Sequence, residues 1–240
     1  MDRQEFIKQI EKQPFSVLGE LVYQYIAHDI IEVHLAPGSK INTTKIAQEL
    51  NISRTPIRTA LDRLVGDGLV EQVGAKGFKV CPVDWKDCIA LYDARKVLEG
   101  NAAYIAANTA TTEHHEKLRY SIQLIKKNQE LGDDLAVFEA DNLFHETVVE
   151  ASGNDYIISL YRSLKPWIRR YQRILVLIKN HQTSTDPHLA AKHLVIYRAI
   201  KNRYSMVAKN EMSDHVNHIY RVLFDRGLVG NERLNGRERK

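Results

Sequence analysis

The chain has 240 residues, of which 44% are hydrophobic and 27% are charged, and this composition excludes large-scale disorder. The formal net charge of +4 is too small to indicate a nucleic-acid partner by itself, and the short, interrupted apolar runs exclude a membrane-spanning helix. The only cysteines are Cys81 and Cys88, and the N-terminus does not resemble a secretion leader, so we expect a cytoplasmic protein without a disulfide framework.

The first part of the sequence predicts helices followed by a β-hairpin. Apolar residues recur every three or four positions up to the Pro37-Gly38 turn, and Thr43 or Thr44 is expected to cap the next helix. Pro56 suits the first turn of a third helix, where a missing N–H costs nothing. The expected helices cover 16–34, 45–51 and a stretch that ends near 66–68, and the expected strands cover 69–73 and 78–80. This order predicts a winged helix-turn-helix over 1–82.

From Asp84 onward the sequence predicts helices and no strands. Pro166 lies inside the fourth of these helices and is a candidate break point, because proline removes a backbone donor. The expected helices cover 84–109, 111–131, 133–151, 154–181, 186–203 and 204–227. The predicted fold class is therefore mainly α, with the winged helix-turn-helix joined to an all-α antiparallel helical bundle over 83–228 and a frayed polar tail over 229–240.

Two arginines define the expected DNA-reading surface. Arg54 and Arg58 lie four residues apart and share the helix face opposite the apolar Ile57. The planar fork of arginine matches guanine O6 and N7, and Ser53 and Thr55 can donate hydrogen bonds to phosphate oxygens. Two arginines on a helix are more often ordinary solvated charges, but the surrounding order of helices and hairpin favours the DNA interpretation.

These residues resemble the GntR family of bacterial transcription regulators. The resemblance covers residues 15–81, and it implies that Arg54 and Arg58 contact bases and phosphates of a double-stranded DNA operator. It also implies a homodimer that binds a pseudo-palindromic site. The matching segments are Leu35–Ile41, Ser53–Leu61, Arg63-Leu64, Gly68–Val70 and Gly77–Val80.

Two departures from the family pattern leave the operator sequence open. Some members carry an arginine in the second helix where this chain has Thr44 beside Lys45, and the wing tip has Lys76 where arginine is common. The DNA-binding residues assigned on this basis are Thr44, Lys45, Ser53, Arg54, Thr55, Arg58, Lys76 and Gly77.

A candidate metal site lies in the second part of the sequence. Asp141 and His145 lie four residues apart on one predicted helix, so their side chains project together. If His193 and His215 on later helices joined them, the set would suit zinc or nickel. An Asp-x-x-x-His pair often arises by chance, so spacing alone leaves open a polar core that binds nothing.

Residues 84–227 resemble the FadR-type C-terminal (FCD) domain found in one GntR subfamily. The matching motifs are Arg95-x-x-Leu98-Glu99, Asp141-x-x-Phe144-His145, Gly153-Asn154, His193-x-x-Ile196 and Ala208-x-x-x-Met212-x-x-His215. The resemblance implies that Asp141, His145, His193 and His215 bind a divalent transition metal, zinc or nickel. His218, one turn after His215, competes for the same role, but the motif favours His215.

The resemblance also implies a small-molecule effector, and we assign Arg95 and Asn154 to its site. Arginine binds carboxylates through two parallel hydrogen bonds, so Arg95 favours a sugar acid or another small organic acid. An ion pair between Arg95 and Glu99 within the helix is an equally good interpretation and need not exclude the first. One member of a second cationic cluster could also line the effector cavity; the cluster comprises Arg169, Arg170 and Arg173.

Taken together, these features predict a ligand-responsive repressor and not an enzyme. An alternative is a regulator whose effector is the metal itself. A metal-dependent hydrolase built on the four metal-binding candidates is a weaker alternative, because the sequence has no HExxH motif, nucleophile elbow or glycine-rich phosphate loop.

Overall fold

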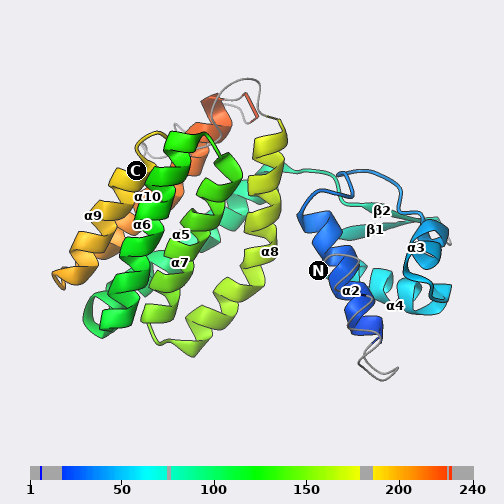
Figure 1. Ribbon diagram of the computed structural model, residues 1–240, viewed down its shortest axis with the longest axis horizontal. Helices are drawn as coiled ribbons and strands as arrows, with labels where there is room; N and C mark the ends of the chain where they lie inside the picture. Colours follow the sequence, from blue (N-terminus) through cyan, green and yellow to red (C-terminus); the bar gives the residue numbers. More distant parts are fainter. Residues whose placement is uncertain (1–5, 7–17, 75–76, 179–185, 226, 229–240) are drawn as a thin grey trace, which may run out of the picture. The chain divides into compact units, whose positions relative to one another are not determined.

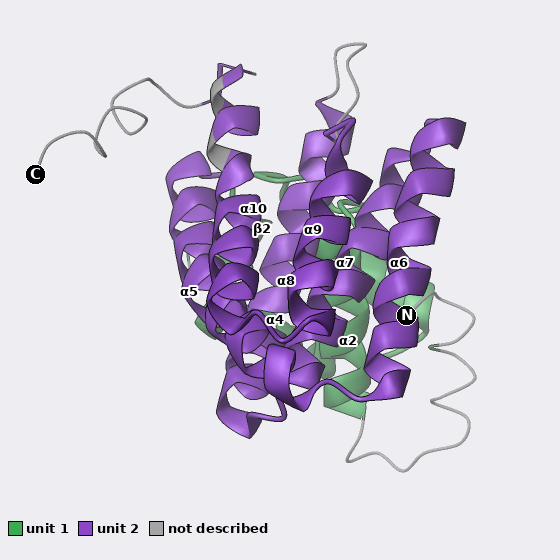
Figure 2. Ribbon diagram, turned by 90° about the vertical axis from the view of Figure 1, so that its left-hand side faces the viewer, with its two compact units in different colours: residues 1–83 green, residues 84–240 purple. Residues whose placement is uncertain are grey.

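The computed structural model describes residues 6, 18–74, 77–178, 186–225 and 227–228. The chain divides into two compact units, Met1–Val83 and Asp84–Lys240, which Figure 2 draws in separate colours. This division lies one residue after the boundary expected from the sequence. The expected polar tail over 229–240 falls outside the described residues.

The first unit contains helices followed by an antiparallel hairpin, so the predicted winged helix-turn-helix is confirmed (Figure 1). Its elements are α2 (Leu18–Ile31), α3 (Thr43–Leu50), α4 (Arg54–Gly66), β1 (Val70–Val73) and β2 (Gly77–Val80). Helix α2 packs against α4, and apolar side chains at helical spacing form the buried faces of both. The most deeply buried of them are Val22, Ile26, Ile30, Ile57, Leu61 and Leu64.

Helix α3 begins two residues earlier than expected, and its cap is a different residue. Asn42 is the N-cap, and its side-chain oxygen accepts a hydrogen bond of 3.0 Å from the Lys45 backbone N–H. The expectation that Thr43 or Thr44 caps this helix is therefore wrong. A side-chain amide oxygen satisfies a free N–H of the first turn as well as a hydroxyl does.

Local backbone geometry limits both helix α2 and the turn of the hairpin. Helix α2 stops at Ile31, before the Pro37-Gly38 turn, and Val33 just beyond it has a left-handed φ of 62°. The hairpin turn needs glycine at position 77, because a Cβ atom there would lie only 2.6 Å from the Val73 carbonyl oxygen. This close approach fixes the start of β2.

The second unit is a helical bundle, as predicted, and its helices are arranged around α5. Its elements are α5 (Trp85–Thr109), α6 (Thr112–Leu131), α7 (Asp134–Ala151), α8 (Asp155–Leu177), α9 (Leu189–Lys201) and α10 (Ser205–Asp225). Helix α5 contacts α7, α8, α9 and α10, while α6 lies along α7 (Figure 1). Small side chains allow α5 and α10 to approach closely, since a Cβ atom at Gly100 would lie 2.4 Å from Ser213 Oγ. Side chains of α5, α7, α9 and α10 therefore meet inside the bundle.

Helix α8 continues through Pro166, so the candidate break does not occur. Figure 1 shows that the helix bends along its course and stays continuous, as helices that contain proline often do. Helix α8 ends at Leu177 and α9 begins at Leu189, and residues 179–185 between them fall outside the described residues.

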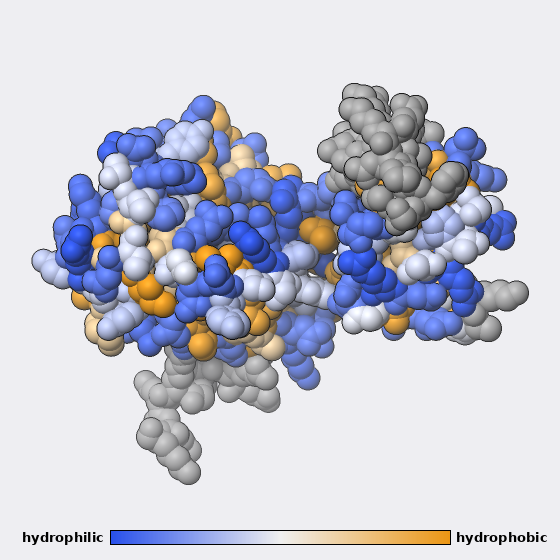
Figure 3. Space-filling model, turned by 90° about the horizontal axis from the view of Figure 1, so that it is seen from below, coloured by the Kyte–Doolittle hydropathy of each residue, from blue (hydrophilic) through white to orange (hydrophobic). Residues whose placement is uncertain are grey.

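Within the described part of the chain, no helix is both long and apolar enough to cross a membrane. On the face shown in Figure 3, hydrophobic residues lie in small groups separated by hydrophilic ones. Large apolar side chains with exposed surface come from several helices and include Tyr156 of α8, which is 84% exposed. Such scattered residues are common on folded proteins and identify no binding face by themselves.

Candidate metal centre and nucleic-acid interface

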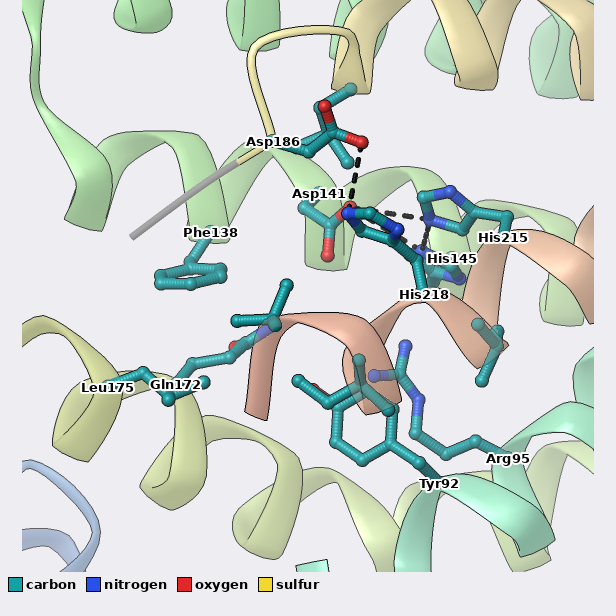
Figure 4. A pocket seen from close by; sticks show the side chains of 14 residues that line it. Tyr92, Arg95, Phe138, Asp141, His145, Gln172, Leu175, Asp186, His215 and His218 are labelled. Atoms are coloured by element: carbon teal, nitrogen blue, oxygen red, sulfur yellow. Dashed lines mark hydrogen bonds and ion pairs between the residues drawn. The ribbon is translucent and has the colours of Figure 1, made fainter. Parts of the chain in front are cut away.

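Four side chains with metal-binding atoms converge inside the second unit (Figure 4). Asp141 and His145 project from α7, His193 from α9 and His215 from α10, and their candidate ligand atoms all lie within 4.8 Å of one another. Asp141 Oδ1 lies 3.0 Å from His193 Nε2, 3.5 Å from His145 Nε2 and 3.9 Å from His215 Nε2. The Nε2 atoms of His145 and His215 are 3.1 Å apart. The fold thus brings together the four residues named from the sequence.

Three of these four separations, 3.0, 3.1 and 3.5 Å, are close to those between ligands of one metal ion, and the 3.9 Å from Asp141 Oδ1 to His215 Nε2 is wider. With metal–ligand bonds of about 2.1 Å, two ligand atoms lie about 3.0 Å apart at a right angle and about 3.4 Å apart at a tetrahedral angle. Asp141 Oδ1 and His193 Nε2 are buried and have no hydrogen-bond partner, although only 3.0 Å separates them. Buried polar atoms without partners are costly, and a shared cation would satisfy both. The donor set therefore fits a divalent transition metal.

Outer hydrogen bonds orient two of the imidazole rings. His145 Nδ1 contacts Glu99 Oε2, and His193 Nδ1 donates to the Leu189 carbonyl oxygen at 2.8 Å. With Nδ1 used in this way, the Nε2 atom of each ring faces the centre of the cluster. Histidine ligands of metals usually have such a partner on their second nitrogen.

The electrostatics of the cluster favour an anionic Asp141. Burial alone would raise the pKa of Asp141, but the neighbouring His145 and His193 rings hold it well below its usual range. Burial lowers the pKa of His215 well below its usual range, and the nearby His193 and His145 rings lower it further. The His215 ring is therefore neutral. Burial would lower the pKa of His145, but Glu99 and Asp141 raise it to about 9. Asp141 and His215 therefore have the forms that bind metals, whereas a metal ion would have to displace a proton from His145.

The cluster forms one wall of a cavity, and Asp141, His145 and His215 line it. Figure 4 shows the Arg95 guanidinium directed from α5 toward this wall. Much of the remaining lining is apolar, so a bound ligand would be shielded from water. The apolar lining residues include Tyr92, Phe138, Leu175, Leu189, Ile219 and Val222.

The ion pair between Arg95 and Glu99 is confirmed, and the effector contact of Arg95 stays a prediction. Its Nε donates a hydrogen bond of 2.6 Å to Glu99 Oε1, and both side chains are buried. The guanidinium carbon also lies 4.6 Å from the centroid of the Tyr92 ring. Arg95 nevertheless lines the cavity, so the ion pair orients the side chain that was assigned to the effector.

Asn154 has a different role from the one expected. Its side-chain oxygen accepts hydrogen bonds of 3.1 Å from the backbone N–H groups of Tyr156 and Ile157, which makes it the N-cap of α8. It is not among the residues that line the cavity. The assignment of Asn154 to the effector site is therefore corrected to a structural one.

The second arginine cluster does not line this cavity either. Arg169 and Arg173 both donate hydrogen bonds to Glu139 of α7, at 2.7 and 3.3 Å. Arg170 is 3% exposed, and its guanidinium carbon lies 5.8 Å from the centroid of the Trp167 ring. The expectation that one of these arginines reaches the effector cavity is wrong for the cavity described here.

Sequence reasoning missed two polar residues of the cavity. Asp186 lies just before α9, and its Oδ2 is 3.2 Å from His218 Nε2, so His218 is paired outside the four-residue cluster. Gln172 of α8 lines the cavity and exchanges hydrogen bonds of 2.9 and 3.2 Å with the buried Asn142. Gln172 could have been noticed as a polar residue on an apolar helix face, whereas no spacing marks Asp186.

In the first unit, α4 presents the predicted DNA-reading face. The helix begins at Arg54, and Arg54, Thr55 and Arg58 are exposed, whereas Ile57 is buried. Arg58 Nε lies 3.9 Å from the nearest carboxylate oxygen of Asp62, a separation that leaves the guanidinium available for another partner.

The other assigned DNA contacts flank this face along the chain. Ser53 is the exposed N-cap of α4, and Thr44 of α3 is half-buried. Lys45 is exposed, with its Nζ 3.6 Å from Glu49. Gly77 begins β2, whereas Lys76 at the predicted wing tip falls outside the described residues.

Family models match both units of the chain. The model described as FCD domain matches residues 90–218, and the model described as bacterial regulatory proteins, gntR family, matches residues 18–80.

Individual proteins give a consistent result. The chain is 27% identical over 197 residues to the uncharacterized HTH-type transcriptional regulator YdhC of Bacillus subtilis (strain 168), which covers 82% of this chain and 86% of that protein. It is 32% identical over 149 residues to a probable D-xylose utilization operon transcriptional repressor of Paenarthrobacter nicotinovorans, which covers 62% of this chain and 66% of that protein. The solved structure titled E. coli McbR/YncC has a TM-score of 0.71 and 20% identity over 88% of this chain and 98% of that chain, which shows a shared fold.

Proposed function

The chain belongs to the gntR family of bacterial regulatory proteins and carries an FCD domain, and from this premise we propose a repressor that responds to a small carboxylate bound at a metal ion. Its relatives are transcription regulators, so the chain is a DNA-binding transcription regulator and not an enzyme. One relative is named a probable repressor of a D-xylose utilization operon, which supports repression.

The DNA-binding half of the proposal concerns α3, α4 and the hairpin. Two copies of the chain, as a homodimer, would place two α4 helices in successive major grooves of a pseudo-palindromic operator. Arg54 and Arg58 would contact base edges and phosphates, and the smaller polar residues would hold the helix in register. The proposed contacts are Thr44, Lys45, Ser53, Arg54, Thr55, Arg58, Lys76 and Gly77.

The metal-binding half of the proposal rests on one observation: four metal-binding atoms converge, and two of them are buried without a hydrogen-bond partner. Asp141, His145, His193 and His215 would hold the ion, and Glu99 and Leu189 would keep two of the rings in position. A zinc or nickel ion held by four protein ligands could expand its coordination and accept an anionic ligand.

Arg95 supplies the second contact of the proposed effector. A carboxylate group between the metal centre and Arg95 would receive charge-assisted hydrogen bonds from the guanidinium. The largely apolar lining lowers the local dielectric and so strengthens this attraction. We propose a small organic acid, such as a sugar acid, whose different affinity for two conformations of the dimer changes operator affinity by about 1–3 kcal/mol.

The first test measures metal content by mass spectrometry in tag-free protein purified without a chelator. It then follows the melting temperature with a panel of small carboxylates, before and after the metal is removed. We expect about one metal ion per chain and a carboxylate that raises the melting temperature only when the metal is present.

Each outcome of this test has a distinct meaning. Metal without any carboxylate response, together with operator affinity that changes with metal alone, would make the metal itself the signal. Absence of metal after supplementation with zinc and nickel would remove the sensing half of the proposal. The DNA-binding assignment would stand in either case, because it depends on the first unit.

A further inference from the structure

Glu99 of α5 lies between the candidate metal centre and Arg95, and solvent does not reach it. Its Oε1 accepts the hydrogen bond from Arg95 Nε at 2.6 Å, and its Oε2 contacts His145 Nδ1. Both partners are themselves buried, with exposed fractions of 2% for Arg95 and 1% for His145. The Glu99 carboxylate therefore contacts both a proposed metal ligand, His145, and the proposed effector contact, Arg95.

The contact with Glu99 controls which nitrogen of His145 is available. A carboxylate only accepts hydrogen bonds, so Nδ1 of His145 carries a proton toward Glu99, and Nε2 is the nitrogen left for a metal ion. The Nε2 atom then faces Asp141 and His215, at 3.5 and 3.1 Å, as a metal ligand must. Without an acceptor at Glu99, neither ring nitrogen would be preferred, and metal binding would have to select the orientation.

The same carboxylate orients Arg95. Its Oε1 holds Arg95 Nε, and the Tyr92 ring 4.6 Å from the guanidinium carbon limits rotation of the guanidinium. Figure 4 shows the two terminal nitrogens of Arg95 directed toward the cavity, where a carboxylate could accept from them. The direction of these donors therefore depends on the position of Glu99.

We propose that Glu99 is the positioning residue that couples metal occupancy to carboxylate binding at Arg95. If metal binding shifted His145, the shift would reach Glu99 through Oε2, and Glu99 Oε1 would pass it to Arg95 Nε. The carboxylate group of Glu99 is planar, and its contacts with His145 and Arg95 are buried. The metal centre and the carboxylate-binding arginine would therefore respond together. This inference rests on the proposed function, because it assigns the communication between its two ligands.

The test uses the full-length chain and its Glu99→Gln variant, which keeps the volume but offers one acceptor oxygen in place of two. Zinc affinity is measured by competition with a chromophoric chelator, and acetate serves as the carboxylate probe in melting experiments at saturating zinc. We expect zinc affinity to fall by about 10–100-fold and the stabilisation by acetate to disappear. The matched control is Glu146→Gln on α7, whose carboxylate contacts Lys165 Nζ at 2.7 Å, and it should leave both properties unchanged.

Three results would overturn the inference. One is a Glu99→Gln chain that loses zinc affinity but still responds to acetate at saturating zinc, because Glu99 then serves the metal alone. Another is a loss of the acetate response with zinc affinity unchanged. A third is wild-type chain that binds neither zinc nor acetate, which removes the proposed function together with the coupling, whereas the first two leave the proposed function standing.

A second measurement covers the case in which Glu99→Gln fails to fold. The side-chain Nε–H resonance of Arg95 in the wild-type chain, assigned with Arg95→Lys, is followed by NMR during zinc titration. We expect this resonance to shift in step with zinc binding, although the proposal places no direct contact between Arg95 and the ion. An unchanged Arg95 resonance at saturating zinc would contradict the coupling.

Discussion

At the scale of single residues, Arg58 offers a way to separate DNA binding from folding. Its side chain is 51% exposed and its nearest carboxylate is 3.9 Å away, so the fold depends little on it. Arg58→Ala should lower operator affinity by about 5–150-fold, the loss of one good base or phosphate contact, without changing the melting temperature. Fluorescence anisotropy with a labelled operator would measure the affinity.

The matched control for this variant is its neighbour Asp62. Asp62 is also exposed on α4, and it carries a negative charge that DNA phosphates repel. Asp62→Ala should therefore keep operator affinity or increase it. Equal affinities for the wild-type chain and the Arg58→Ala variant would show that α4 does not read the operator through this residue.

His193 and His218 separate the metal cluster from its surroundings. His193 is completely buried with its Nε2 directed at Asp141, whereas His218 is paired with Asp186. His193→Ala should lower bound zinc at least tenfold and also lower the melting temperature of zinc-supplemented protein. His218→Ala should retain the zinc. Elemental analysis of both variants measures the bound zinc. Loss of zinc in His218→Ala alone would mean that His218, and not His193, is the metal ligand.

The sequence predicts site residues well only where spacing reflects a shared helix face. Asp141 and His145 could be paired because four residues span one turn, but joining them to His193 and His215 required the family resemblance. The contact between Glu99 and His145 depends on how α5 and α7 pack, which no local pattern encodes. Asn154 was misassigned because a polar residue after glycine suits a helix cap as well as a ligand site.

At the scale of elements, Asn154 provides the sharpest prediction. Its side chain satisfies two backbone donors in the first turn of α8, so Asn154→Ala should lower the free energy of unfolding by about 1 kcal/mol. Asn154→Asp keeps the acceptor and should restore the stability. Urea unfolding measures the change in the free energy of unfolding. Zinc content and the response to carboxylate should stay unchanged. Loss of the carboxylate response with normal stability would instead place Asn154 in the effector site.

The helices themselves could be predicted from their apolar periodicity, whereas their ends could not. Asn42 caps α3 although threonines at the next two positions looked equally suitable, and the choice depends on backbone angles outside the helix. Pro166 does not interrupt α8, because a helix can bend at proline when packing on its neighbours maintains it.

At the scale of the whole molecule, the two units could be recognised from the change from helix-and-hairpin to helix-only patterning near Asp84. What the sequence could not give is the arrangement around α5 that brings α7, α9 and α10 to one cavity. Contacts between helices far apart in the sequence depend on packing of complementary surfaces, as where Gly100 of α5 meets Ser213 of α10.

The proposed effect of a bound carboxylate on operator affinity must be reciprocal, whatever structural route connects the two sites. If a carboxylate changes operator affinity by some factor, thermodynamic linkage requires that operator DNA change carboxylate affinity by the same factor. For a zinc-loaded chain we expect a factor of about 5–150 in both directions, and little effect of either ligand on the other in His193→Ala. Anisotropy gives the first factor, and calorimetric titration of carboxylate into the free and operator-bound chain gives the second. Carboxylate binding that is tight but identical with and without the operator would mean that the cavity stabilises the fold and does not regulate DNA binding, because a ligand with equal affinity for two states shifts neither.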